Sequence, residues 1–160
     1  MNIAIRRFPA ILLLAFAMLG SAIAAAPVNT LEKSGLLGRF KPSDVAIRGY
    51  DTVAYFTEGK PVEGSSEFTA EWQGANWQFS SAENQALFEA NPEQYAPQYG
   101  GYCAYGVASG YLVKIEPENW TIVEDKLYLN YDSEVQAKWE KDIPGFLQQA
   151  NQKFDGLLNE

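Results

Sequence analysis

Glycine, proline and asparagine divide this 160-residue chain into short segments. Gly59, Gly74, Asn91-Pro92 and Gly100-Gly101 each interrupt a run of apolar residues, and no sequence repeat is visible across these breaks. The interrupted runs have strand period in some places and helix period in others, without a regular strand-helix order. The sequence therefore predicts an α+β fold: one small domain with short antiparallel hairpins, several helices and an amphipathic C-terminal helix.

Two hairpins and two further strands are expected from alternating apolar residues. The first hairpin joins 68–72 to 76–79 around Gly74, and the second joins 121–123 to 127–129. Residues 45–47 and 111–115 are rich in β-branched and aromatic side chains and are predicted to be single strands.

The expected helices follow capping residues. Asp51 is expected to cap one or two turns at 53–56. Ser80 with Glu83, and Ser133 with Gln136, have the spacing of a capping box before a helix. A second helical piece is expected to run through residue 95, and a short helix to begin almost at residue 103. The C-terminal helix is predicted from an apolar stripe after a proline, made of Ile143, Phe146, Leu147, Ala150, Phe154, Leu157 and Leu158.

Residues 1–24 have the composition of a cleavable export signal. Arg6 and Arg7 precede the unbroken apolar run 11–19, which is shorter than the ~20 residues of a membrane-spanning helix. Small residues favour cleavage after Ala24, with Ala25 as the next choice. We therefore expect an exported protein, periplasmic or secreted and without a stable membrane anchor, with a lead-in segment at 25–42 and the domain at 43–160.

The chain is acidic, with 20 Asp and Glu against 12 Lys and Arg and a net charge of −8. Loss of Arg6 and Arg7 with the signal would leave 10 basic residues and a net charge of −10. Because nucleic acids and anionic membranes are bound through Lys and Arg, neither class of partner is expected.

Cys103 is the only cysteine, and the chain has no histidine. No internal disulfide can form. Since both methionines, Met1 and Met18, lie in the signal, Cys103 is the only soft metal ligand of the remaining chain, so a zinc or copper site within one chain is not supported. Four acids could bind a hard cation through their carboxylates, but no spacing resembles an EF-hand loop, and we interpret them as a solvated face: Glu116, Glu118, Glu124 and Asp125.

Several segments resemble known proteins. GYDTVAYF at 49–56 and WQFSS at 77–81, followed by Phe88, Pro92 and Tyr95, resemble a YHS domain. Over about 44–145 the chain is similar to the exported YHS-domain (seleno)protein group, most closely at YGGYCA (99–104), WTI (120–122) and LYLNY (127–131).

The resemblance implies the family fold and an association with metal handling through paired cysteines. This chain has Ser80 and Asn84 where those cysteines would stand, so the thiolate pair is absent. The resemblance also implies that some relatives use selenocysteine, and Cys103 is the residue here that could occupy such a position.

Cys103 is the sharpest candidate for chemistry. A thiol near a helix start would be exposed to unpaired backbone N–H groups, which lower the thiol pKa; the alternative is a buried, inert cysteine. Tyr99, Tyr102 and Tyr105 could wall a pocket around Cys103. In a separate hypothesis these three line a groove for an apolar or planar ligand together with Tyr50 and Tyr55, and with Tyr95 and Tyr111 beside them; core packing is the alternative.

Three functions remain open. The first is an exported YHS-type binding or accessory module for an undefined small ligand or protein partner, with a metal cofactor undefined. The second is a redox protein in which catalytic Cys103 uses an external resolving thiol, since no second cysteine exists. The third is a structural partner-binding domain with a buried Cys103. No Ser-His-Asp set or carboxylate pair indicates an enzyme.

Overall fold

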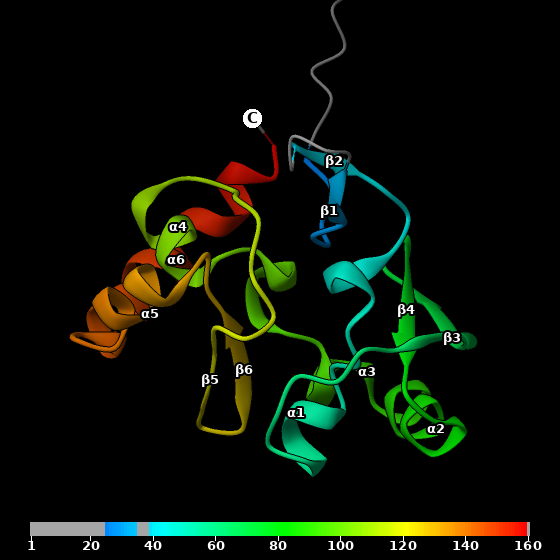
Figure 1. The fold of residues 1–160 in the computed structure, drawn as a ribbon. Helices are drawn as coiled ribbons and strands as arrows, with labels where there is room; N and C mark the ends of the chain where they lie inside the picture. Colours follow the sequence, from blue (N-terminus) through cyan, green and yellow to red (C-terminus); the bar gives the residue numbers. More distant parts are fainter. Residues whose placement is uncertain (1–24, 35–38, 160) are drawn as a thin grey trace, which may run out of the picture.

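The computed structural model describes residues 25–34 and 39–159, so the predicted signal segment lies outside the described residues (Figure 1). Within them, three antiparallel strand pairs are present: β1 with β2, β3 with β4, and β5 with β6. Their bounds are β1 Leu31–Ser34, β2 Arg39–Pro42, β3 Ser65–Trp72, β4 Ala75–Phe79, β5 Trp120–Val123 and β6 Lys126–Leu129. The two predicted hairpins are confirmed, and β1 with β2 adds a third inside the lead-in segment.

Both predicted hairpins close through two residues with positive φ. Gln73 and Gly74 have φ of 49° and 75°, and Glu124 and Asp125 have φ of 51° and 58°. Two left-handed residues in a two-residue loop make a type I′ turn, whose twist matches that of the paired strands. Local turn chemistry thus sets the register of both hairpins.

The helices are short except for the last one. Their bounds are α1 Ala54–Thr57, α2 Ala82–Ala90, α3 Pro92–Tyr95, α4 Ala104–Ser109, α5 Ser133–Trp139 and α6 Ile143–Leu157, with 3₁₀ turns η1 at Ala46–Gly49 and η2 at Gln98–Gly101. The α+β class is confirmed. The C-terminal helix α6 packs on α4, and its stripe residues Ile143, Phe146, Leu147, Phe154 and Leu157 contact the core.

Two predicted caps are wrong by one residue. Ser81, not Ser80, caps α2 by accepting a hydrogen bond from the Asn84 N–H at 3.1 Å. Asp132, not Ser133, caps α5 through the Val135 N–H at 2.8 Å. In the first case Ser80 is not free to cap the helix, because its hydroxyl donates to a buried carboxylate.

Neither single strand forms. Residues 46–49 make the 3₁₀ turn η1, in which Ile47 and Arg48 have φ of 50° and 57°, and only Val45 keeps an isolated bridge to Asn76. Residues 111–116 form no helix or strand, although Ile115 is buried. The apolar β-branched residues of these two segments pack in the core without pairing as strands. Strand propensity predicts strands there because the same residue types favour both strands and burial.

The order turn–helix–hairpin–helix occurs twice, although the sequence shows no repeat. The first unit contains η1, α1, β3–β4 and α2, and the second contains η2, α4, β5–β6 and α5. Figure 1 shows the units side by side. Buried Asn29 joins the two turns: its N–H donates to the Gly100 carbonyl at 2.8 Å, its side chain donates to Gly101 at 3.0 Å, and its carbonyl accepts from the Ile47 N–H at 3.0 Å. The lead-in segment therefore contributes to the domain.

Aromatic side chains fill the core of each unit. In the first, Phe88 packs on Trp77 and Phe79 with ring centroids 5.0 Å apart in both pairs. In the second, the buried ring of Trp139 lies 5.6 Å from Tyr128 and stacks on Phe146 at 6.0 Å. Packing of this kind supplies stability without a disulfide.

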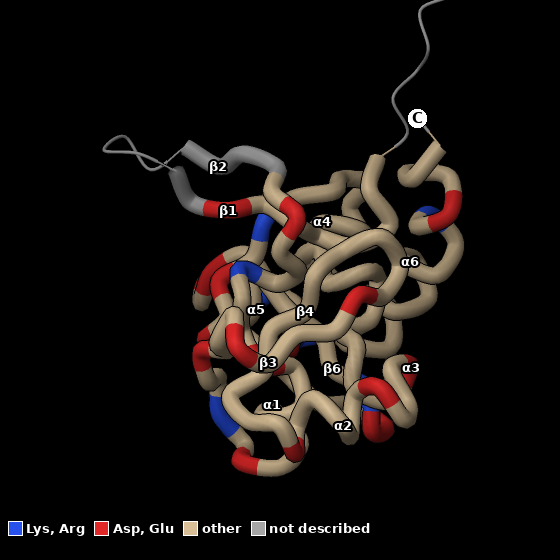
Figure 2. The backbone as a smooth tube through the Cα atoms, turned by 90° about the vertical axis from the view of Figure 1, so that its right-hand side faces the viewer, with Lys and Arg blue, Asp and Glu red and all other residues tan. Residues whose placement is uncertain are grey.

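Acidic residues are distributed around the periphery of the domain (Figure 2). None of the helices in the described ranges is long and apolar enough to cross a membrane.

Candidate functional site

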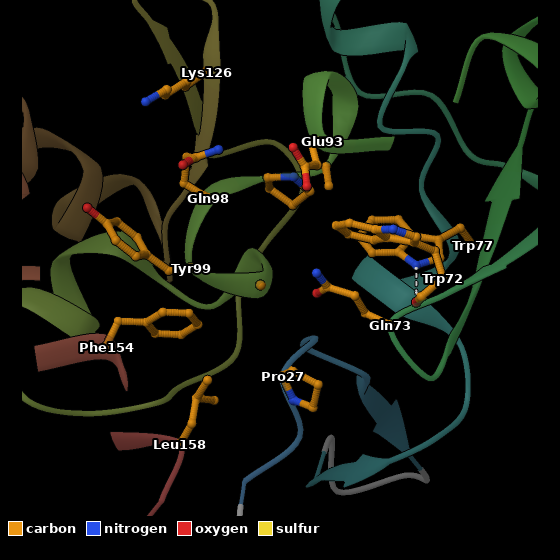
Figure 3. A pocket seen from close by; sticks show the side chains of 13 residues that line it. Pro27, Trp72, Gln73, Trp77, Glu93, Gln98, Tyr99, Lys126, Phe154 and Leu158 are labelled. Carbon is orange, nitrogen blue, oxygen red and sulfur yellow. Dashed lines mark hydrogen bonds between the residues drawn. The ribbon is translucent and has the colours of Figure 1, made fainter. Parts of the chain in front are cut away.

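A cleft of about 560 Å³ opens where the first unit, η2, α6 and the lead-in segment meet. Figure 3 shows the side chains that surround it. Pockets of about 300–1,000 Å³ are typical of small-molecule sites. The lining residues come from five parts of the chain: Pro27; Trp72, Gln73 and Trp77; Glu93, Ala96, Pro97, Gln98, Tyr99 and Gly100; Lys126; and Phe154 and Leu158.

Two aromatic walls bound the cleft. On one side lie the indoles of Trp72 and Trp77, edge to face with centroids 5.6 Å apart, and the Trp77 Nε1–H donates to the Trp72 carbonyl at 3.0 Å. On the other side lie Tyr99 and Phe154, also edge to face at 5.6 Å (Figure 3). These ring–ring contacts and the indole hydrogen bond hold the walls in place, so the cleft is preformed.

Tyr99 is anchored at its polar end. Its hydroxyl donates to Asn151 Oδ1 of α6 at 2.8 Å. Burial, with a smaller effect from Tyr128, raises the Tyr99 pKa far above that of a free tyrosine, because the charged phenolate is disfavoured at this buried position. The ring therefore presents an apolar surface to the cleft while its hydroxyl bonds to the protein.

The polar groups of the cleft lie at its edges. Lys126 begins β6, Glu93 lies in α3, and both are exposed. Figure 3 shows them with Gln98 along one side, and Gln73 lies nearer the other side. Neither Glu93 nor Lys126 takes part in an ion pair within the part of the chain that the structure describes.

Of the tyrosines predicted to bind ligand, Tyr99 alone lines this cleft. The hydroxyl of Tyr50 lies 3.4 Å from Glu63 Oε1, and the buried Tyr55 donates to the Pro117 carbonyl at 2.9 Å. Tyr102 donates to the Ala26 carbonyl at 3.0 Å, and Tyr105 packs edge-on against Phe146. The structure thus places four of these tyrosines in separate packing positions.

Aromatic residues of the cleft also contact the hydrophobic core. Trp77 is 1% exposed and belongs to the buried core, Trp72 packs against that core, and Phe154 belongs to the predicted C-terminal apolar stripe. No sequence signal marks Trp72 as a cleft residue, because its partial exposure depends on the assembled fold.

Cys103 is buried, with 1% of its surface exposed, and it caps α4. Its sulfur accepts from the Gly106 N–H at 3.3 Å and donates to Asn130 Oδ1 at 3.7 Å. Burial raises the pKa of the thiol, and backbone N–H groups, that of Gly106 first among them, oppose this effect without reversing it. The expectation that the helix start lowers the thiol pKa is therefore wrong, because desolvation outweighs the N–H donors.

The positions expected to hold the family's cysteines contain a hydrogen-bonded polar cluster around Asp51. The carboxylate of Asp51 is buried and accepts from the Ser80 N–H at 2.8 Å, the Ser80 hydroxyl at 2.6 Å and the Asn84 side-chain amide at 2.7 Å. Its other oxygen accepts from the N–H groups of Val53 and Ala54 at 2.9 and 3.2 Å. Because protein donors occupy both oxygens and no thiolate is near, these residues do not fit a soft metal ion.

The acidic residues considered for a hard cation are not gathered at one place. Glu116 bonds to Arg48 and Lys114, and Glu124 and Asp125 form the β5–β6 turn. Among the described residues, no group of three or more His, Cys, Asp or Glu side chains is arranged to hold a metal ion.

The fold is thus that of a small α+β domain with a preformed aromatic cleft. The family model for the YHS domain matches residues 53–99, so the chain contains a YHS domain. The match covers α1, β3–β4, α2 and α3 and ends at Tyr99, within η2. The rest of the second unit, from α4 to α5, lies beyond it. No curated protein and no solved structure matches the chain.

Proposed function

We propose that this chain is an exported YHS-domain binding module whose ligand site is the aromatic cleft. The preformed 560 Å³ cleft between two aromatic walls is the observation that carries the proposal. Fixed aromatic rings offer a large apolar contact area and lose little conformational entropy when a ligand binds. The ligand class that fits such walls is a small organic molecule with a planar apolar body.

The proposal is tested by NMR titration of the folded domain with N-acetyl-L-tryptophanamide, a neutral planar probe. Indole N–H signals report the site directly. Binding should shift those of Trp72 and Trp77 while leaving that of Trp139, which is fully buried in the second unit, unmoved.

A variant pair separates the cleft from nonspecific stacking. Trp72→Ala should weaken binding of the probe about 5- to 150-fold, since one aromatic stacking contact contributes about 1–3 kcal/mol. Tyr111→Ala removes an aromatic ring that is 66% exposed and outside the cleft, and should leave affinity unchanged. Equal effects of the two variants would refute the proposal, as would the absence of a shift at both cleft indoles with this probe and with charged probes that have the same indole body.

Export is the second part of the proposal, and it rests on the composition of residues 1–24. Expression of the whole chain in a bacterium should yield a periplasmic or secreted form that begins at Ala25 or Ala26, as determined by intact mass. A cytoplasmic form of full mass only would contradict it.

The position of Cys103 argues against the redox alternative. A reactive cysteine needs access to its substrate and a thiolate at working pH, whereas this thiol is 1% exposed and burial raises its pKa. A buried cysteine is instead what the partner-binding alternative requires, and that alternative becomes the better account if the cleft binds no small ligand.

A further inference from the structure

The two charged side chains of the cleft have opposite sign and lie on adjacent elements. Gln94, next to Glu93 in α3, has its side-chain amide 3.5 Å from the Asp125 carbonyl, next to Lys126 in β6. Helix α3 and the β5–β6 turn are therefore neighbours. Neither charge has an ion-pair partner among the described residues, so each is available to a ligand.

The apolar walls and the charges occupy different parts of the cleft. The rings of Trp72, Trp77, Tyr99 and Phe154 form its sides, and Glu93, Gln98 and Lys126 lie along one edge (Figure 3). A ligand with its flat body between the walls would present its polar end to this edge. The Glu93 carboxylate and the Lys126 ammonium at this edge complement a polar end that carries both an ammonium and a carboxylate.

We propose that the cleft selects a small aromatic zwitterion, an aromatic amino acid or a molecule with the same ring, ammonium and carboxylate groups. This inference rests on the proposed function. The ring inserts between the aromatic walls, the ammonium pairs with Glu93 and the carboxylate pairs with Lys126. A ligand that has only the ammonium leaves Lys126 without a partner and near a charge of its own sign. A ligand that has only the carboxylate leaves Glu93 in the same position.

Four probes with the same indole body test the charge requirement in calorimetric titrations at low salt. L-tryptophan carries both charges, tryptamine only the cation, indole-3-propionate only the anion, and N-acetyl-L-tryptophanamide neither. L-tryptophan should bind most tightly. Exposed ion pairs are weak, so each charge should contribute about a two- to fivefold change in Kd.

Two variants assign each charge to its side chain. Glu93→Gln should weaken L-tryptophan and tryptamine about two- to fivefold and leave indole-3-propionate no weaker; Lys126→Gln should weaken L-tryptophan and indole-3-propionate and spare tryptamine. Glu134→Gln and Lys138→Gln make the same changes of net charge on α5, away from the cleft, and should alter no Kd.

The outcomes separate this inference from the proposed function. If N-acetyl-L-tryptophanamide binds in the cleft as tightly as L-tryptophan, or if both cleft variants affect all probes alike, the zwitterion selectivity is refuted while the binding function stands. If none of the four probes shifts the indole signals of Trp72 and Trp77, the proposed function fails, and this inference fails with it.

Discussion

Asp51 offers the sharpest test of how this domain is held together. Its buried carboxylate accepts five hydrogen bonds and links the start of α1 to the start of α2. Asp51→Asn keeps the size of the side chain but replaces one accepting oxygen with an NH₂ group. If the remaining oxygen stays with Ser80 and Asn84, the new NH₂ faces the N–H groups of Val53 and Ala54, which lose their acceptor.

The expected cost follows from these contacts. A hydrogen bond to a charged group contributes about 1.5–3 kcal/mol, and a buried donor left unsatisfied costs about 1–3 kcal/mol. Removal of the buried charge returns part of this loss, because burying an ion is itself unfavourable. We expect Asp51→Asn to lower the free energy of unfolding by about 3 kcal/mol, which lowers Tm by about 10 °C in a domain of this size.

Urea unfolding of the protein without residues 1–24, followed by circular dichroism, measures this change. Asp155→Asn, at an exposed position of α6, is the matched control and should stay within about 0.5 kcal/mol of the unmodified protein. Ser80→Ala removes the hydroxyl that donates to Asp51 and accepts from the Asn84 side-chain amide at 3.3 Å, and should cost about 1 kcal/mol. A double-mutant cycle should show coupling between positions 51 and 80. A loss below 1 kcal/mol for Asp51→Asn would refute the assignment of Asp51 as the centre of this cluster.

The other predictions concern backbone strain, the buried thiol and the loss of stability at acid pH. Gly100→Ala should destabilise the domain by about 3 kcal/mol in urea unfolding, since φ is 59° and a Cβ would collide with the backbone of the lead-in segment. Gly156→Ala, where a Cβ on α6 meets open space, should stabilise the domain by about 0.5–1 kcal/mol. Similar changes in stability for the two variants would contradict this reasoning. Cys103 should resist iodoacetamide at pH 8 until denaturant is added, and rapid labelling of the native protein would refute its burial. Because burial raises the pKa of this thiol, its contribution to stability is complete below the ordinary thiol pKa of about 8.5 and is lost as pH rises further. Partial burial of Glu116 raises its pKa, but hydrogen bonds from Lys114 and Arg48 outweigh this effect and hold the pKa below the ordinary value, so the stabilising contribution of Glu116 is present above about pH 4.3 and is lost as pH falls through the folded-state pKa. Arg48→Gln should therefore reduce the fall of the urea midpoint between pH 5 and pH 3. An equal fall in the variant and in the unmodified protein would contradict this prediction.

Features that depend on near neighbours in the chain could be predicted from the sequence. Both hairpins follow from two-residue turns, and α1 begins where Asp51 can accept from N–H groups two and three residues ahead. The C-terminal apolar stripe predicts the face of α6 that meets the core. In each case the interaction that selects the conformation lies within a few residues.

The functional assignments depended on the tertiary structure, because burial and distant contacts decide them. The same helix-start geometry that would activate an exposed Cys103 leaves its pKa raised once the thiol is buried. Ser80 was expected to cap a helix, but Asp51, 29 residues earlier, recruits its hydroxyl.

The cleft shows the same division between local and distant interactions. Its walls and charges come from Pro27, Trp72, Glu93, Lys126 and Phe154, which no local pattern connects. The sequence by itself determined the secondary-structure elements and the family resemblance, through periodicity, turn residues and caps. Only the packing of the two units with the lead-in segment and α6 decided which aromatic rings face solvent together, because exposure is a property of the assembled fold.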